Sequence, residues 1–348
     1  MKKSLQIGGV FVGLIVGAGF TSGQEIMQFF TSFGFIGIAG AFFATFAFSF
    51  LGMILAQLGS QLQTTSHKDV IYYMGGRSIG LILDLFITLC LFSVAVVMFA
   101  GSGAMFHQMF GISPAIGSIV MVCLTIGTLL LNVQNIMQII AMLTPYLMTV
   151  IFIILMYSLW TMDLSLLEAN QLAQMQQPAN SNWFISALLY VSYNIVIGAA
   201  MLIVMGGTVK DRKVAGLGGI FGGLMLGTLI LLINIALFVK IDVVAGVDMP
   251  TLALAMQIHP FVGTLVAIAL LGMMYSTAVG MFYTFTVRFI TPTHPLFKPA
   301  LIFVGTVGFV ASFIGFSNLV GKVYASMGYL GFGLIVIVVF TWWKKRRL

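Results

Sequence analysis

The stretch Gly13-Leu14-Ile15-Val16-Gly17-Ala18-Gly19-Phe20-Thr21-Ser22-Gly23-Gln24-Glu25 lies in the middle of an otherwise apolar segment, residues 5–31. Its four glycines and its polar end are unusual for a simple membrane anchor. Each glycine weakens a helix by ~1 kcal/mol relative to alanine. Irregular backbone inside a bilayer is tolerated only where it is buried in protein or lines a cavity. The stretch therefore predicts a transmembrane helix that is interrupted beside a cavity.

The composition of the chain agrees with a membrane location. The chain has 348 residues, of which 60% are hydrophobic and 7% charged, and its mean hydropathy is +1.13. A soluble domain carries about 25% charged residues. This excludes a soluble enzyme, a nucleic-acid-binding protein and a disordered chain. The two cysteines, Cys90 and Cys123, lie in apolar runs and predict neither a disulfide nor a metal site.

The fold class predicted from these features is an all-α polytopic membrane protein with ten transmembrane helices. A helix needs ~20 apolar residues to cross the hydrocarbon layer. Polar residues, glycine and proline between the apolar runs then mark the turns between successive spans. The predicted spans are residues 5–31, 36–62, 78–106, 113–131, 135–160, 183–207, 214–240, 260–290, 297–316 and 319–343.

The positions of the basic residues predict the orientation of these spans. With the N-terminus inside, cytoplasmic segments hold 13 of the 15 Lys and Arg residues, whereas Lys240 is external and Lys322 lies within the last span. The external loop 161–182 carries Asp163 and Glu168 and no positive charge. This positive-inside pattern predicts a multi-pass protein of the cell membrane with cytoplasmic N- and C-termini. The net charge of +7 then reports contact with the lipid bilayer, not with nucleic acid.

The sixth predicted span repeats the features of the first. It reads Tyr190-Val191-Ser192-Tyr193-Asn194-Ile195-Val196-Ile197-Gly198-Ala199-Ala200, with a polar and aromatic cluster at mid-depth followed by small residues. Interrupted helices at matching positions of two inverted repeats point to the midplane site of a secondary transporter. We therefore predict a five-helix repeat over residues 1–160, an external loop 161–182, and a second, inverted repeat over 183–348 with an external segment 241–259.

This 5+5 plan with interrupted helices 1 and 6 resembles the neurotransmitter:sodium symporters and the wider amino acid–polyamine–organocation superfamily, which share the LeuT-like fold. The segment from Val16 to Glu25 is most similar to the YkvI-type bacterial membrane proteins. The resemblance to that group covers nearly the whole chain. The resemblance to the sodium symporters is limited to the plan and to short motifs.

The resemblance implies a substrate site at the two interruptions. In the symporters, freed backbone amides of the first helix hold a substrate carboxylate, and the matching residues here are Gly17, Ala18 and Gly19. A half-helix N-terminus with unpaired N–H groups suits such an anion. The other substrate-site candidates are the polar and aromatic residues near the two breaks, namely Thr21, Ser22, Glu25, Tyr190, Ser192, Tyr193 and Asn194.

The resemblance also implies a sodium site, with carbonyls on helix 1 and a carbonyl and two hydroxyls on helix 8. The matching residues are Gly13, Val16, Met273, Ser276 and Thr277. Ser276 and Thr277 follow Met273 at i+3 and i+4, which places all three on one helix face. The alternative is that the two hydroxyls bond back to carbonyls of their own helix. No cofactor is predicted besides Na⁺ as a coupling ion.

Three charged residues are candidates for gating or coupling. Glu25 lies inside the first span, where a carboxylate usually faces a cavity or a partner. It binds substrate or a proton, pairs with Lys322 across the entrance, or is buried and neutral. Lys322 alternatively extends outward to the interface. Asp84 is a candidate for an inner gate, pairing with Arg77, Arg288 or Lys210, or else a solvated interface residue.

The predicted function is sodium-coupled symport of an amino acid or a similar small zwitterion by alternating access, with helices 1, 2, 6 and 7 moving against the rest. One alternative is a proton-coupled transporter that uses Glu25. Another is a ligand-sensing membrane subunit that binds without transport, like the germinant-receptor subunits of the same superfamily. No nucleophile–base set, nucleotide loop or metal cluster is present in the sequence, so we do not expect an enzyme.

Overall fold

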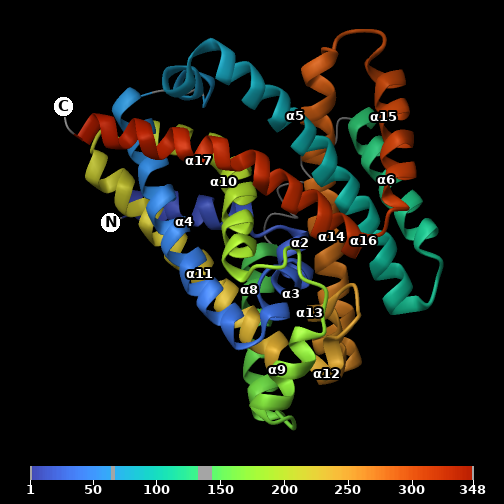
Figure 1. Ribbon diagram of the computed structural model, residues 1–348. Helices are drawn as coiled ribbons and strands as arrows, with labels where there is room; N and C mark the ends of the chain where they lie inside the picture. The colour runs from blue at the N-terminus through green and yellow to red at the C-terminus, as the bar shows by residue number, and fades with distance from the viewer. Residues whose placement is uncertain (1, 64–66, 132–142, 347–348) are drawn as a thin grey trace.

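The computed structural model describes residues 2–63, 67–131 and 143–346. Every regular element in these residues is a helix. Six of the described helices are long and apolar enough to cross a membrane: Phe35–Leu62, Leu85–Phe110, Trp183–Gly207, Arg212–Val239, Pro260–Phe289 and Phe316–Lys344. The protein is therefore an all-helical membrane protein with several spanning helices. In Figure 1 the two ends of the chain lie toward the same side of the view, and α9 and α12 lie at the opposite end.

The first predicted span is interrupted twice. Helix α1 (Lys2–Ile15) ends before Val16 and Gly17, and α2 (Ala18–Thr21) is a single turn. Ser22 and Gly23 separate α2 from α3 (Gln24–Phe29), and Gly23 has a φ of 83°. Only glycine adopts this left-handed conformation without strain. The interruption predicted from the glycine-rich stretch is thus confirmed.

Four helices pack into one bundle: α1, α4 (Phe35–Leu62), α10 (Trp183–Gly207) and α11 (Arg212–Val239). A 3-10 turn, η1 (Thr31–Phe33), leads from α3 into α4. Small residues let these helices approach closely, as is usual in membranes. A Cβ placed on Gly219 would lie 2.2 Å from the carbonyl carbon of Gly52, so the backbones of α4 and α11 leave no room for a side chain there. These helices are the first, second, sixth and seventh predicted spans.

A second group contains α5 (His67–Phe110), α6 (Pro114–Leu131), α14 (Pro260–Phe289) and α15 (Phe297–Ser312). Helix α5 packs against all three of the others, and the group lies beside the first bundle in Figure 1. Helix α8 (Leu143–Trp160) packs against α11 of the first bundle and α14 of the second group. The beginning of the predicted span 135–160 lies outside the described residues.

The predicted interruption of the sixth span is wrong, because α10 is continuous from Trp183 to Gly207. Ser192, Tyr193 and Asn194 need no break, because their side chains form hydrogen bonds from an intact helix. Asn194 Nδ2 donates to the carbonyl of Tyr190 one turn earlier, at 3.0 Å. Gly198 serves packing instead, because a Cβ there would lie 3.4 Å from the ring of Phe11.

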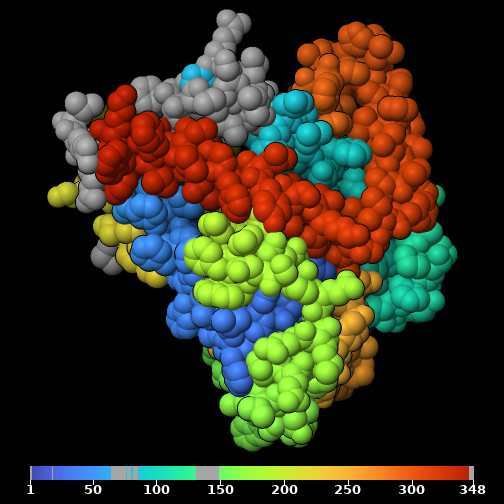
Figure 2. Space-filling view, viewed as in Figure 1, coloured from blue at the N-terminus to red at the C-terminus, as the bar shows by residue number. Residues whose placement is uncertain are grey.

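The last span contains the irregular backbone of the second half. After α15, a short helix α16 (Phe316–Leu319) leads into a π-helical turn, η2 (Val320–Tyr324), and then into α17 (Ala325–Arg346). Figure 2 shows α17 crossing the visible face of the molecule beside α10 and α4, with which it is in contact. π-helical turns occur frequently at functional sites.

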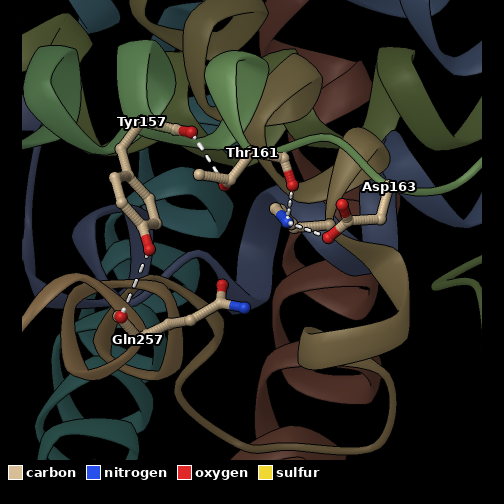
Figure 3. Close-up of polar contacts among 5 residues, drawn as sticks. Tyr157, Thr161, Asp163 and Gln257 are labelled. Atoms are coloured by element: carbon tan, nitrogen blue, oxygen red, sulfur yellow. Dashed lines mark hydrogen bonds and ion pairs between the residues drawn. The ribbon is translucent and has the colours of Figure 1, made fainter.

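Short helices form one end of the molecule: α9 (Leu166–Gln174), α12 (Ile241–Val244) and α13 (Pro250–Ile258). Ser165 and Glu168 form a capping box at the start of α9, and hydrogen bonds from Ser165 lower the pKa of Glu168. Buried Lys240, at the end of α11, donates to the carbonyl of Thr161 and pairs with Asp163 at 3.4 Å. Figure 3 shows these contacts beside Tyr157, whose hydroxyl reaches the carbonyl of Gln257 on α13 at 3.5 Å.

Candidate functional site

A cavity of about 310 Å³ lies between the first bundle and the second group. The interrupted first span and α10 form one wall, α5 and α14 form the opposite wall, and η2 contributes one residue. Eight residues predicted for the site line this cavity. The described residues that line it are Gly13, Leu14, Ile15, Gly17, Gly19, Glu25, Val94, Met98, Tyr193, Asn194, Ile197, Ser276, Thr277, Gly280, Met281 and Tyr324.

Glu25 lies at the start of α3 and is 5% exposed. One carboxylate oxygen, Oε2, accepts a hydrogen bond from the hydroxyl of Tyr193 on α10. The other oxygen, Oε1, lies over the backbone of α2, because a Cβ placed on Gly19 would be 2.0 Å from it. The side chain therefore reaches back from α3 across the break and fills the space that Gly19 leaves open.

Aromatic rings form the wall around this carboxylate. The rings of Tyr193 and Tyr324 stack with centroids 4.9 Å apart and an interplanar angle of 27°. Tyr190 packs edge-on to Tyr193 at 5.5 Å and also contacts Phe29 and Phe30. Tyr190 is buried behind the cavity and is not part of its lining. Tyr190 was predicted to contact substrate, but in the structure it supports the ring of Tyr193 from behind the cavity wall.

Gly13 of α1 and Gly17 in the first break face open space. A Cβ on Gly13 would have no heavy atom within 4 Å, and one on Gly17 would meet only the carbonyl oxygen of Ile15, at 3.9 Å. By contrast, Gly8 packs tightly, since its Cβ would lie 3.0 Å from the nitrogen of Gly222. Gly13 and Gly17 therefore line the cavity and do not pack against a neighbouring helix.

Thr21 and Ser22 stabilise the two breaks and do not line the cavity. Thr21 Oγ1 donates to the carbonyl of Gly17 at 3.0 Å. Ser22 Oγ donates to the carbonyl of Gly19 at 2.7 Å and accepts from the backbone N–H of Gln24 at 3.2 Å. These bonds satisfy polar backbone groups that the interruption frees. Ala18 belongs to α2, but its side chain is outside the described residues.

The five residues predicted to bind sodium are divided between the cavity and its surroundings. Gly13, Ser276 and Thr277 line the cavity. Ser276 Oγ donates to the carbonyl of Met273 at 3.1 Å, which is the bond within a helix that the alternative predicted. Met273 and Val16 are buried outside the lining. The sulfur of Met273 lies 3.9 Å from Thr21 Oγ1, so α2 and α14 touch at this point.

The remaining α10 candidates point in different directions. Asn194 lines the cavity next to Tyr193. Ser192 faces α17, where its hydroxyl donates to the carbonyl of Gly328 at 2.7 Å. Ser192 therefore attaches α10 to α17 and lies outside the cavity lining.

The predicted gate pair of Glu25 and Lys322 is absent from the described residues. Lys322 is exposed, whereas Glu25 is buried and bonded to Tyr193. The ion pair found in the described part of the chain is Lys240–Asp163. Asp84 falls in α5, but its side chain is outside the described residues. Arg288 donates from Nη1 to the hydroxyl of Thr88 on α5 at 2.7 Å.

Of the lining residues that sequence reasoning missed, Tyr324 is the aromatic one. It lies at the end of the π-helical turn, and its ring faces the cavity beside Tyr193. The sequence does carry a signal for it. Residues 315–324, Gly-Phe-Ser-Asn-Leu-Val-Gly-Lys-Val-Tyr, form a polar and glycine-containing cluster at the boundary between the predicted spans 297–316 and 319–343.

A second cavity of about 190 Å³ adjoins the first and shares four of its lining residues, Leu14, Val94, Ile197 and Met281. Its other lining residues run along α5, α10 and α14 to Arg288 near the end of α14: Ile87, Cys90, Leu91, Val196, Ala200, Thr284 and Arg288. The two cavities together form a path from the interrupted helix toward the Arg288 end of the molecule.

Polar contacts close the other side of the site. Gln24 Nε2 donates to Ser317 Oγ at 2.8 Å, and Gln28 Nε2 donates to the Ser317 carbonyl at 2.9 Å. Ser317 Oγ in turn donates to Asp248 in the α12–α13 connection. The backbone N–H of Thr251 on α13 donates to the Ser22 carbonyl at 3.0 Å. We call the contacts among Gln24, Gln28, Ser317 and Asp248 the outer latch, after the side on which the topology predicted from the sequence places them.

Two curated bacterial proteins are similar to the chain over nearly its whole length. The uncharacterized membrane protein YkvI of Bacillus subtilis is 27% identical over 347 residues, which cover 98% of this chain and 97% of that protein. The uncharacterized protein YyaD of the same organism is 28% identical over 338 residues, covering 95% of this chain and 94% of that protein. No family model matches the chain.

Solved structures of transporters share the fold. The inward-facing conformation of Mhp1 superposes with a TM-score of 0.65 at 13% identity, covering 96% of this chain and 74% of that one. A manganese transporter of Eremococcus coleocola gives 0.62 at 16% identity, covering 97% and 78%. A Na⁺-coupled sialic acid symporter gives 0.57 at 14% identity, covering 94% and 78%. The LeuT-like fold is therefore confirmed, and these structural neighbours are transporters.

Proposed function

We propose that the chain is a secondary active transporter that carries an amino acid or a similar small zwitterion in symport with sodium. The observation that supports this most is the cavity at the helix break, because it gathers predicted substrate residues (Gly17, Gly19, Glu25) and predicted sodium residues (Gly13, Ser276) in one place. Structural neighbours with this fold have names that describe very different cargoes, manganese and sialic acid. The substrate class therefore depends on the cavity and not on the fold.

The proposed topology is ten spans in two inverted halves, residues 1–160 and 183–348, separated by an external loop 161–182. The six long apolar helices account for most of the spans. Three shorter apolar helices, Pro114–Leu130, Thr149–Trp160 and Phe297–Ser312, and the interrupted first span supply the rest. We place both termini in the cytoplasm of a cell-membrane protein, on the basis of the Lys and Arg distribution. This puts the outer latch outside and Arg288 inside.

Alternating access then follows from the two packing groups. The bundle of α1, α4, α10 and α11 moves against the group of α5, α6, α14 and α15, and the cavity lies between the two. In the described state the outer latch is closed, and the second cavity extends toward Arg288. Substrate binds near the bilayer midplane, and either side opens in turn.

The proposed sodium site lies where α1 faces α14. Carbonyl and hydroxyl oxygens suit a hard cation, and Ser276 Oγ lies 3.1 Å from the carbonyl oxygen of Met273. On binding Na⁺, the hydroxyl turns its hydrogen away from that carbonyl, so both oxygens become ligands. Gly13 and Val16 supply carbonyls from α1, and Thr277 supplies a second hydroxyl.

Uptake into vesicles tests this proposal. Purified protein is reconstituted, and radiolabelled amino acids are offered under an inward gradient of Na⁺ or of choline. Accumulation that requires Na⁺ supports symport. The transport proposal would be contradicted if no amino acid in the panel were taken up faster than into empty vesicles, with or without Na⁺.

A second candidate is proton coupling through Glu25. The observation in its favour is that Glu25 is a buried carboxylate in the cavity with a hydrogen-bond donor, Tyr193, and no basic partner among the described residues. Accumulation driven by a pH gradient in choline, and lost in Glu25→Gln, would favour this mechanism. If uptake by Glu25→Gln is still driven by Na⁺ and is as fast as in the unmodified protein, proton coupling through Glu25 is excluded.

A further inference from the structure

We infer that Glu25 binds the amino group of the substrate, so that an organic ammonium group, not a carboxylate, is the feature that the cavity recognises. This inference rests on the proposed function and names the chemical group by which the site selects its cargo. The observations that carry it are the position of Glu25, the neutral character of the rest of the lining, and the two tyrosine rings beside the carboxylate.

The first observation is the charge of the cavity. Among the described residues that line it, Glu25 is the charged one, and the others are Gly, Leu, Ile, Val, Met, Tyr, Asn, Ser and Thr. Lys322 is exposed and lies outside the lining. Arg288 belongs to the adjoining cavity, where it donates to Thr88. An ionised Glu25 therefore makes the cavity negative, and in a medium of low dielectric constant this strongly favours a cation over an anion.

The second observation is where the carboxylate lies. Oε1 of Glu25 lies over Gly19, at the position that the symporter resemblance assigns to a substrate carboxylate. Two carboxylates at this position would repel each other. The α2 turn has only four residues, and the helix dipole of so short a segment is too small to offset that repulsion. The ammonium end of a zwitterion fits this position better than its carboxylate end does.

The third observation is the arrangement of the tyrosines. The hydroxyl of Tyr193 donates to Oε2, which fixes the carboxylate and leaves the remaining lone pairs for another donor. An ammonium group has three N–H donors, and one acceptor fixed in this way suits it well. The stacked rings of Tyr193 and Tyr324 also present π-electron density, which attracts organic cations more than it attracts neutral solutes.

Thiol chemistry tests the charge preference without requiring a known substrate. The native cysteines are removed (Cys90→Ala, Cys123→Ala), and Met281→Cys places a reporter on the wall shared by the two cavities. The full-length protein in detergent is treated with trimethylammonioethyl or sulfonatoethyl methanethiosulfonate. The measured quantity is the labelling rate with the cationic reagent divided by the rate with the anionic reagent. We expect this ratio to be about tenfold or more above the ratio for a free thiol in solution. Glu25→Gln should remove this preference. Glu168→Gln, which changes an exposed carboxylate on α9, should leave the ratio unaltered.

Competing solutes test the recognised group. Two matched sets are added, L-phenylalanine with 2-phenylethylamine and 3-phenylpropanoate, and L-alanine with ethylamine and propanoate. Protection of the reporter by the amino acid and the amine of one set, but not by its carboxylate, supports the inference. Tyr193→Phe should weaken that protection and keep the ring.

Three outcomes would overturn it: protection by a carboxylate as strong as by its amine, failure of both amines to protect, or a reagent ratio that Glu25→Gln does not change. Protection by NaCl or by acid alone, with no further effect of the amines, assigns Glu25 to an inorganic cation or to a proton and likewise overturns it. These measurements do not require transport. A protein that shows the ammonium preference but does not accumulate amino acids in vesicles keeps this site and loses the proposed symport function.

Discussion

The carboxylate of Glu25 occupies the space that a side chain at position 19 would fill, since a Cβ on Gly19 would lie 2.0 Å from Oε1 of Glu25. The two residues are six apart in sequence and belong to different helices, α2 and α3. The bend at Ser22 and Gly23 brings them together. The Glu25 carboxylate can therefore lie over α2 only because position 19 has no side chain.

Gly19→Ala should separate the carboxylate from its place over α2. Because the displaced atoms are at the end of a flexible side chain, we expect a loss of stability of no more than about 1 kcal/mol and a decrease in substrate affinity of about tenfold or more. Thermal unfolding and vesicle uptake measure the two effects. Gly9→Ala is the matched control, because a Cβ there meets nothing within 4 Å. Uptake in Gly19→Ala equal to that in Gly9→Ala would contradict the prediction.

Ser276→Ala and Thr277→Val should each raise the Na⁺ concentration needed for half-maximal uptake by about tenfold, since each removes an oxygen ligand. Na⁺-dependent uptake in vesicles measures this effect. Thr264→Val is the control, because Thr264 lies on the same helix, and its hydroxyl bonds to the Pro260 carbonyl at 3.0 Å far from the cavity lining. If all three variants have the same Na⁺ dependence, the sodium site lies elsewhere.

Lys240 and Asp163 should contribute unequally to stability although they form one ion pair. Lys240 is 2% exposed, and it also donates to the Thr161 carbonyl, whereas the Asp163 side chain is 89% exposed. Lys240→Ala removes both bonds and leaves a void, so we expect a destabilisation of about 2 kcal/mol or more. Asp163→Asn should change stability by less than about 1 kcal/mol. Thermal unfolding in detergent compares them, and equal effects would show that the pair itself dominates.

Ser317→Ala should loosen the outer latch. It removes the hydroxyl that accepts from Gln24 and donates to Asp248, while the bond from Gln28 to the backbone carbonyl remains. A membrane-impermeant thiol reagent applied from outside should then reach Met281→Cys several-fold faster. Asn318→Ala is the control, since among the described residues Asn318 bonds locally, to the Ile314 carbonyl at 3.2 Å. An unchanged labelling rate in Ser317→Ala would show that the latch does not hold the outer side closed.

The sequence predicted helix ends well where an apolar run stops at turn-forming residues. The span predicted at 183–207 coincides with α10, and the span predicted at 260–290 differs from α14 by one residue. The interruption at Gly17 was also predictable, because clustered glycines lower helix stability over several neighbouring residues. Hydrophobicity and punctuation are local properties of the chain, which is why these elements were found.

The errors arose where the hydrogen-bond partner of a polar side chain, local or distant, decides what that side chain does. The polar cluster in α10 indicated a break, but Asn194 bonds to a carbonyl of its own helix, and Tyr193 donates to Glu25 of α3 on the same wall of the cavity. In Thr21 and Ser22 the polar groups bond to the local backbone instead of facing the cavity. The spacing of polar residues along a chain does not show which side chains bond to the backbone at a helix break and which face the cavity, where they can bind a ligand.

The π-helical turn at Val320–Tyr324 makes the shape of the cavity sensitive to the length of the chain as well as to its composition. Such a turn contains one residue more than the α-helical path it replaces, and each residue of an α-helix turns the chain by about 100°. Removing one residue from this turn would restore an ordinary helix and reshape the wall beside Tyr324, while the helix on either side kept its register. In the evolutionary history of such a chain, a single-codon deletion or insertion here would alter selectivity in one event, without any substitution in the binding site.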